Sequence, residues 1–194
     1  SLKKISVHGI DVSKTMTEYG NNQIAHLTKK KPLSYVSESA FTKEIIKSKA
    51  NIISAIGVIE HLREPHKFFD AFKKSNSNYL YYSVPMFSFS VILENIFKNV
   101  FPRQLSGGHT HLFTEKSLKK LNQLNGVKSI SEWRFGTDAM DFFRNLTIEL
   151  KINSASQKMI DYVYEGYGKR IDEIQSIFDK NHFCSEIHVV AEKC

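Results

Sequence analysis

The sequence predicts an α/β protein with a doubly wound, mostly parallel sheet and helices on both faces. Two observations predict it. Strand-like and helical segments alternate along the chain, which is typical of this class. In addition, residues 51–58 (NIISAIGV) are nearly all apolar or small, as a strand buried on both faces requires.

The elements follow from apolar spacing and from residues that begin or end helices. Strands are expected at 4–10, 33–37, 51–58, 79–84, 127–135 and 184–192. Helices are expected between them, at 14–30, 42–47, 65–74 and 114–125. The last helix has the clearest ends, because Thr114 is a good N-cap and Gly126 suits the position after a helix.

Two longer segments interrupt this alternation and are interpreted as helical cap insertions in one domain, residues 1–194. The first insertion, 85–111, is rich in aromatic and aliphatic residues and contains the spacing of an amphipathic helix. The second, 136–183, has a long helical pattern. Both are expected to lie on the substrate side of the sheet edge, and the second is alternatively a helical pair used in a homodimer.

Composition narrows the functional classes. The 194 residues carry a formal net charge of +7, with 41% hydrophobic and 24% charged residues. The lysines are scattered over predicted helix faces, so nucleic acid is not the expected partner. No apolar run is long enough for a membrane span. Cys184 and Cys194 give no disulfide framework, which favours reduced thiols in a cytoplasmic protein.

Polar residues follow the buried strand at the place where α/β proteins bind ligands. Glu60 and His61 end the apolar run, and Pro65 then begins the next helix. Ligands of open α/β sheets bind outside the carboxyl ends of the strands, so this junction is a candidate site. The structural alternative is an ordinary strand-to-helix junction with two solvated side chains.

Three segments resemble the class I S-adenosylmethionine-dependent methyltransferases. VIEHLREP, residues 58–65, resembles the segment that ends the family's fourth strand. ISVHGIDVS, residues 5–13, is similar to the end of its second strand, and residues 107–126 (GGHTHLFTEKSLKKLNQLNG) to the approach to its fifth helix. The resemblance implies the family's fold and S-adenosylmethionine as cofactor.

The same resemblance implies a set of cofactor-binding residues. Asp11 stands where the family's acidic residue binds the ribose hydroxyls, and Val12 would flank the adenine. Ser39 and Ala40 match the segment beside the adenine amine. The residues that would lie beside the methionine part of S-adenosylmethionine are Ala55, Ile56 and Gly57.

The family's first strand and glycine-rich loop have no counterpart in this sequence. The one Gly-x-Gly of the chain, at 166–168, lies in the second insertion and does not follow an expected strand, and the sequence begins at the family's second strand. We therefore expect a piece truncated before that loop, which on its own binds the cofactor weakly or not at all and is inactive. The sheet is expected either to have a gap that another segment fills or to pair 5–10 directly with 51–58.

The acceptor side of the site is expected to depend on histidines. His109 and His111 are the predicted catalytic residues, because imidazole accepts protons near neutral pH. No divalent metal is expected; the alternative is a site made by Glu60, His61 and His109, which resembles part of the metal motif of small-RNA 2′-O-methyltransferases. Loop hydrogen bonding is the structural alternative for the histidines.

Substrate contacts are predicted at four residues, namely His61, Trp133, Asp138 and Arg144. Asp138 and Asp141 alternatively form a capping box at a helix start. We expect methyl transfer to a small molecule, with a sugar or surface-glycan precursor as the candidate substrate. The alternatives are an RNA 2′-O-methyltransferase-like enzyme and a degenerate domain that binds a partner.

Overall fold

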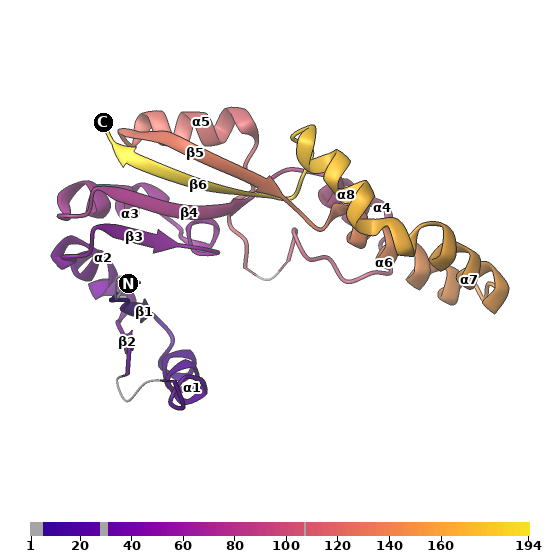
Figure 1. Ribbon diagram of the computed structural model, residues 1–194, viewed down its shortest axis with the longest axis horizontal. Coiled ribbons are helices and arrows are strands. Elements are labelled where there is room, and N and C mark those ends of the chain that lie inside the picture. Colours follow the sequence, from indigo (N-terminus) through magenta and orange to yellow (C-terminus); the bar gives the residue numbers. More distant parts are fainter. Residues whose placement is uncertain (1–5, 28–30, 107) are drawn as a thin grey trace, which may run out of the picture.

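Six strands form two separate sheets in the computed structural model, which describes residues 6–27, 31–106 and 108–194 (Figure 1). The smaller sheet pairs β1 (Gly9–Asp11) with β2 (Leu33–Tyr35) in parallel. The larger sheet has the order β3-β4-β6-β5. Its strands are β3 (Ile52–Ala55), β4 (Tyr79–Pro85), β5 (Val127–Phe135) and β6 (Glu186–Lys193).

The strand directions agree with the predicted class. β3 and β4 are parallel, and β6 is antiparallel to both β4 and β5. β3, β4 and β5 therefore share one direction and β6 runs against them. The prediction of an α/β fold with a mostly parallel sheet is confirmed.

The two sheets are not joined by hydrogen bonds between β1 and β3 within the described ranges. In the part that the structure describes, the expected direct pairing of these strands is therefore wrong, and no strand fills the gap between them. β1 is instead attached by side chains, because Ile10 packs against the main apolar core. Phe41, in the helix that follows β2, also packs there and stacks on Phe68.

Helices connect the strands nearly as predicted. α3 (Pro65–Lys74) has the expected bounds, and α5 (Glu115–Leu124) begins after the predicted N-cap Thr114. α1 ends at Gln23, well before the predicted end, and residues 28–30 lie outside the described ranges. The remaining elements are α1 (Lys14–Gln23), α2 (Glu38–Lys47), a 3₁₀ turn η1 (Ile59–His61), α4 (Phe89–Ile96), α6 (Asp138–Ile152), α7 (Gln157–Gly166), η2 (Gly168–Arg170) and α8 (Ile171–Lys180).

One face of the larger sheet carries the core. Alternate residues of β4 and β6 point into it, as the period of two in a strand requires. Helices α2, α3 and α5 cover this face, and the fully buried members include Phe69, Phe72, Leu80, Tyr82, Ile187 and Val189.

The opposite face of the larger sheet is open where helices were expected. Ile52 is 56% exposed and Trp133 is 63% exposed on that face. The strand 51–58, predicted to be buried on both faces, is therefore buried on one, and it ends early at Ala55. The apolar run predicted burial but could not show which faces are covered.

The two insertions pack against each other. α4 from 85–111 contacts α6 from 136–183, and α6 also contacts α8. Figure 1 shows α6, α7 and α8 extending away from the end of the sheet rather than over β3. Among the described residues, no helix has the length and apolar character needed to cross a bilayer.

Candidate functional site

A tight turn after β3 buries the side chain of Glu60. Gly57 has a positive φ of 63°, which favours glycine, and its amide donates to the Ser83 hydroxyl of β4 at 3.2 Å. The chain then enters η1, where Ile59 and Glu60 are both buried. Glu60 is only 5% exposed, although it lies at the carboxyl edge of the sheet.

A second segment, residues 108–113, is bonded to this turn. The backbone amides of Thr110 and His111 donate to the carbonyl oxygen of Glu60 at 2.8 and 3.2 Å. The Thr110 hydroxyl donates to the same oxygen at 2.7 Å. These bonds place His109 beside η1, although the two segments are about fifty residues apart in the sequence.

Glu60, His61 and His109 consequently form one cluster. Their possible ligand atoms all lie within 4.8 Å of one another. The imidazole rings of His61 and His109 are 4.9 Å apart between centroids, and His61 Nε2 lies 3.9 Å from Glu60 Oε1. The cluster combines one carboxylate with two imidazoles.

His111, the other predicted catalytic residue, lies next to this cluster but not within it. Its Nδ1 is 2.8 Å from the Thr110 hydroxyl, and its ring stacks on Phe113 with a centroid distance of 6.1 Å. The structure thus brings His109 to Glu60 and His61, whereas His111 is held by its own loop.

The predicted cofactor residues lie at three strand ends and most are exposed. Asp11 ends β1, and its Oδ1 accepts a hydrogen bond from the Ser13 amide at 2.6 Å. Val12 and Ser39 are exposed, Ala40 is half-buried, and Ser39 contacts the Ser37 hydroxyl at 3.1 Å. At the end of β3, Ala55 is buried while the next two residues, Ile56 and Gly57, are exposed.

These residues fit the groups of S-adenosylmethionine that the resemblance assigns to them. An exposed carboxylate can accept hydrogen bonds from a ribose diol, and exposed apolar side chains can flank an adenine ring.

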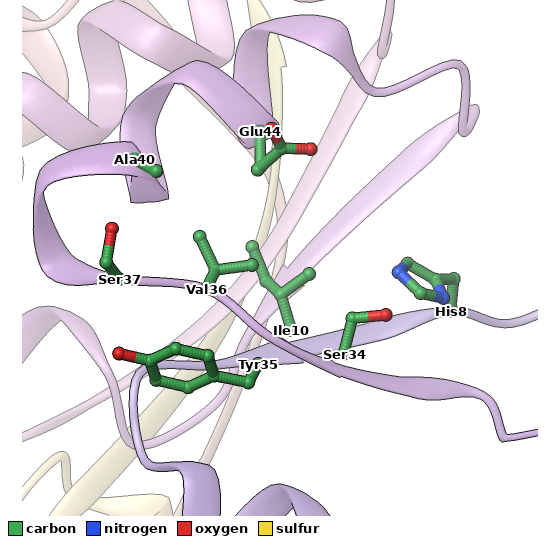
Figure 2. Close-up of a pocket in the computed structure, with 8 residues that line it drawn as sticks. All are labelled: His8, Ile10, Ser34, Tyr35, Val36, Ser37, Ala40 and Glu44. Atoms are coloured by element: carbon green, nitrogen blue, oxygen red, sulfur yellow. The ribbon is translucent and has the colours of Figure 1, made fainter.

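A cavity of about 320 Å³ lies between the smaller sheet and α2 (Figure 2). It is lined by His8, Ile10, Ser34, Tyr35, Val36, Ser37, Ala40 and Glu44. Of the predicted cofactor residues, only Ala40 is in this lining. The cavity therefore borders the predicted adenine side but does not contain the ribose-binding position Asp11.

Asp138 is not exposed, and its carboxylate is surrounded by hydrogen-bond donors. It is completely buried, and its Oδ1 accepts hydrogen bonds from the Ser88 hydroxyl at 2.6 Å and the Ser90 amide at 2.9 Å. Its Oδ2 accepts from the Ser185 amide at 2.8 Å. These bonds join α6 to the start of α4 and to the segment before β6. Predicted as a substrate contact, Asp138 has no free oxygen facing solvent.

The capping box expected at Asp138 and Asp141 is not formed, because the start of α6 has no side-chain cap hydrogen bond. Thr137, not Asp138, is the N-cap of α6, and the Thr137 hydroxyl donates to Asp141 Oδ2 at 3.0 Å. Asp141 also pairs with Arg103 at 3.0 Å. The two aspartates thus have a structural role, but it is to join neighbouring segments and not to cap the helix.

The structure does not bring the other predicted substrate residues together. Arg144 donates to the Phe101 carbonyl at 3.2 Å, within the helical insertion. Trp133 lies on the open face of the sheet, 4.8 Å from Phe135 and 5.6 Å from His188 between ring centroids. His61 is the member that lies in the histidine cluster.

The sequence did not predict two groups that hold the histidine cluster in position. These are the Thr110 hydroxyl and the Gln104 carbonyl oxygen, which lies 3.0 Å from His109 Nδ1. A backbone carbonyl has no sequence signal. Thr110 stands between two histidines, which could have drawn attention to it.

No known family profile matches the chain, and no curated protein does. Solved structures do match. A candidate sarcosine dimethylglycine methyltransferase from Galdieria sulphuraria has a TM-score of 0.56 at 10% identity, over 97% of this chain and 69% of that one. The magnesium protoporphyrin IX methyltransferase from Synechocystis PCC 6803, with bound S-adenosylhomocysteine, has a TM-score of 0.55 at 11% identity, over 97% and 64%.

The chain therefore has the class I methyltransferase fold, as the resemblance implied. It spans about two thirds of the length of these structures. The [4+2]-cyclase SpnF is also similar, with a TM-score of 0.53 at 11% identity, over 97% of this chain and 66% of that one. Identities this low define the fold and leave the reaction to the residues of the site.

Proposed function

We propose that this chain forms part of an S-adenosylmethionine-dependent methyltransferase that acts on a small molecule. One observation carries the proposal. On a class I methyltransferase fold, the exposed carboxylate of Asp11 ends β1, and the Glu60–His61–His109 cluster follows the end of β3. A cofactor-binding acid and a group of acceptor-side side chains thus each follow the carboxyl end of a strand, which is where α/β sheets bind ligands.

The cofactor side consists of Asp11, Val12, Ser39, Ala40 and the residues that end β3, Ala55 to Gly57. S-adenosylmethionine, when bound, supplies an activated methyl group. Asp11 holds the ribose through charge-assisted hydrogen bonds, and Val12 packs on the adenine. The left-handed turn at Gly57 lets the backbone approach the methionine part without a Cβ in the way.

The acceptor side consists of His61, His109 and His111. His109 Nδ1 donates to the Gln104 carbonyl, so its Nε2 carries the lone pair of the ring, and the ring lies in one cluster with Glu60 and His61. The methyl acceptor has to lose a proton in most O- and N-methyl transfers, and imidazoles promote this either as proton acceptors or as ligands of a metal ion.

The distribution of charge supports a small molecule over a nucleic acid. Several lysines on the helices are paired with acids one turn away, for example Lys47 with Glu44, Lys73 with Asp70 and Lys169 with Glu165. Such pairs lower the positive potential that would attract a phosphate backbone. The burial of Asp138 removes one carboxylate from the expected sugar contacts, so the proposal is limited to the small-molecule class.

A ligand panel in a thermal-shift assay tests the proposal. The full-length protein of which this chain forms part is heated with S-adenosylmethionine, S-adenosylhomocysteine, ATP, NAD and adenosine. The proposal predicts that the first two ligands raise Tm more than ATP or NAD, since binding to the folded state stabilises it. Equal shifts with all adenine ligands, or none with the first two, would contradict the cofactor assignment.

A further inference from the structure

We infer that Glu60, His61 and His109 bind one divalent transition-metal ion. The inference rests on the contacts of these three side chains and does not depend on methyl transfer. The first observation is their convergence, since one carboxylate oxygen and two ring nitrogens lie within 4.8 Å of one another. Three ligand atoms that an ion would draw to about 2 Å from itself are already within reach of a common point.

The second observation is the state of the two imidazole rings. Nδ1 of His61 lies 3.2 Å from the carbonyl oxygen of Gly108, and Nδ1 of His109 lies 3.0 Å from that of Gln104. A carbonyl oxygen only accepts, so both Nδ1 atoms carry the hydrogen. Each Nε2 then has a free lone pair. Metal-binding histidines are held in this way, with the second ring nitrogen donating to a carbonyl or carboxylate.

The third observation is an unsatisfied oxygen. Glu60 Oε2 is buried and has no hydrogen-bond partner among the residues that the structure describes. Leaving a buried carboxylate oxygen without a partner is costly, and a cation between the carboxylate and the two imidazoles would remove that cost.

The fourth observation is that the chain holds the three ligands before any ion arrives. The carbonyl oxygen of Glu60 accepts the bonds of Thr110 and His111, which fixes the loop that carries His109. Gly108 has a positive φ of 86°, so this loop turns sharply just before His109.

The donor set indicates the class of ion. Two imidazoles and a carboxylate suit Mn²⁺, Fe²⁺, Co²⁺ or Zn²⁺ rather than Ca²⁺ or Mg²⁺, which prefer oxygen ligands alone. Three protein ligands leave at least one coordination position open. Since His61 is exposed, that position can be reached from solvent.

Cobalt titration tests the inference without any cofactor. Tag-free protein is freed of metal with EDTA and titrated with Co²⁺, and binding is followed by calorimetry and visible absorption. We expect one equivalent per chain. The variants Glu60→Gln, His61→Ala and His109→Ala should each weaken binding by more than the roughly 10–100-fold that loss of an outer-shell partner costs.

The chain offers a matched control in another glutamate–histidine pair. His66 Nε2 lies 3.9 Å from Glu64 Oε1, the same separation as in the His61–Glu60 pair, but both side chains are largely exposed. The variants Glu64→Gln and His66→Ala should leave Co²⁺ binding unchanged.

Stability gives a second readout that folding defects cannot imitate. Without metal, Glu60→Gln should melt at or above the temperature of the wild type, because it removes a buried charge that lacks a partner. The wild type should gain Tm with Co²⁺ and the variant should not. The inference is overturned if the wild type binds no equivalent of Co²⁺, or if the three cluster variants bind it as tightly as the wild type.

Discussion

The Thr110 hydroxyl donates a hydrogen bond to the carbonyl oxygen of Glu60 at 2.7 Å. The amide of Thr110 donates to the same oxygen at 2.8 Å. Two bonds between one pair of residues join the turn after β3 to the loop that carries His109. The position of the His109 imidazole relative to the Glu60 carboxylate therefore depends on Thr110.

Replacing Thr110 with valine should loosen this junction while keeping the shape of the side chain. We expect the free energy of unfolding to fall by about 1 kcal/mol, the usual net value of one hydrogen bond. Co²⁺ affinity should fall about 10–100-fold, because His109 loses part of its support. Denaturant unfolding and cobalt titration measure the two effects.

The variant Thr147→Val is the control for this change. The Thr147 hydroxyl also donates to a backbone carbonyl, that of Phe143 at 2.8 Å, but within α6. It should lower stability to a similar extent and leave Co²⁺ affinity unaltered. If both variants bound Co²⁺ like the wild type, Thr110 would not position His109.

Asp138 should matter for stability and not for substrate. The variant Asp138→Asn keeps the volume but replaces one acceptor oxygen by a donor that faces the Ser88 and Ser90 hydroxyls or the Ser185 amide. Loss of a buried, charge-assisted bond should cost about 1.5–3 kcal/mol in the free energy of unfolding. Urea denaturation checks this, with the exposed Asp172→Asn as control. A loss below that of the control would mean that Asp138 is not needed for the fold.

The two cysteines should react at very different rates. Cys184 is buried, and this burial raises the pKa of its thiol to about 11. At pH 8 only about one Cys184 in a thousand is then a thiolate, the reactive form. Cys194 is exposed. A thiol-reactive dye at pH 8 should show one fast thiol.

That fast phase should disappear in Cys194→Ser and remain in Cys184→Ser. The slow thiol should react faster as the pH rises toward 11, because its thiolate fraction grows. Two equally fast thiols in the folded wild type would show that Cys184 is not protected.

Catalysis should depend on His109 through the metal. His109→Ala should lower turnover on the acceptor by about a hundredfold or more, with affinity for S-adenosylhomocysteine nearly unchanged. His111→Ala should also lower turnover, while retaining Co²⁺ binding. EDTA should abolish wild-type activity and Co²⁺ or Mn²⁺ should restore it. Activity that survives EDTA but falls at acid pH would instead make His109 a proton acceptor without metal.

The sequence predicted the elements that have local signals. Thr114 caps α5 together with Ser117, and α3 begins at Pro65 as expected, because capping and proline effects act within a few residues. Strand 127–135 has the predicted bounds. The early end of β3 and the open face of the sheet depend on what packs against them, and apolar runs do not reveal this.

The site was predictable in part for the same reason. Glu60 and His61 are adjacent in sequence, and the resemblance added His109 from a distant segment. The buried, unsatisfied Glu60 oxygen and the two Nδ1 contacts arise from tertiary folding. Asp138 looked like a surface ligand because aspartate is usually exposed, yet hydroxyl and amide donors from Ser88, Ser90 and Ser185 bury it.

The central claim is that Asp11 binds the cofactor. Calorimetric titration of S-adenosylhomocysteine into the full-length protein of which this chain forms part tests it most directly. Asp11→Asn keeps an acceptor for the Ser13 amide and removes the charge, whereas Asp11→Ala removes both. We expect one site in the wild type and a loss of about 1.5–3 kcal/mol of binding free energy in Asp11→Ala, with a smaller loss in Asp11→Asn. The exposed Glu18→Gln should bind like the wild type. Absence of binding by the wild type, or full affinity in Asp11→Ala, would contradict the account.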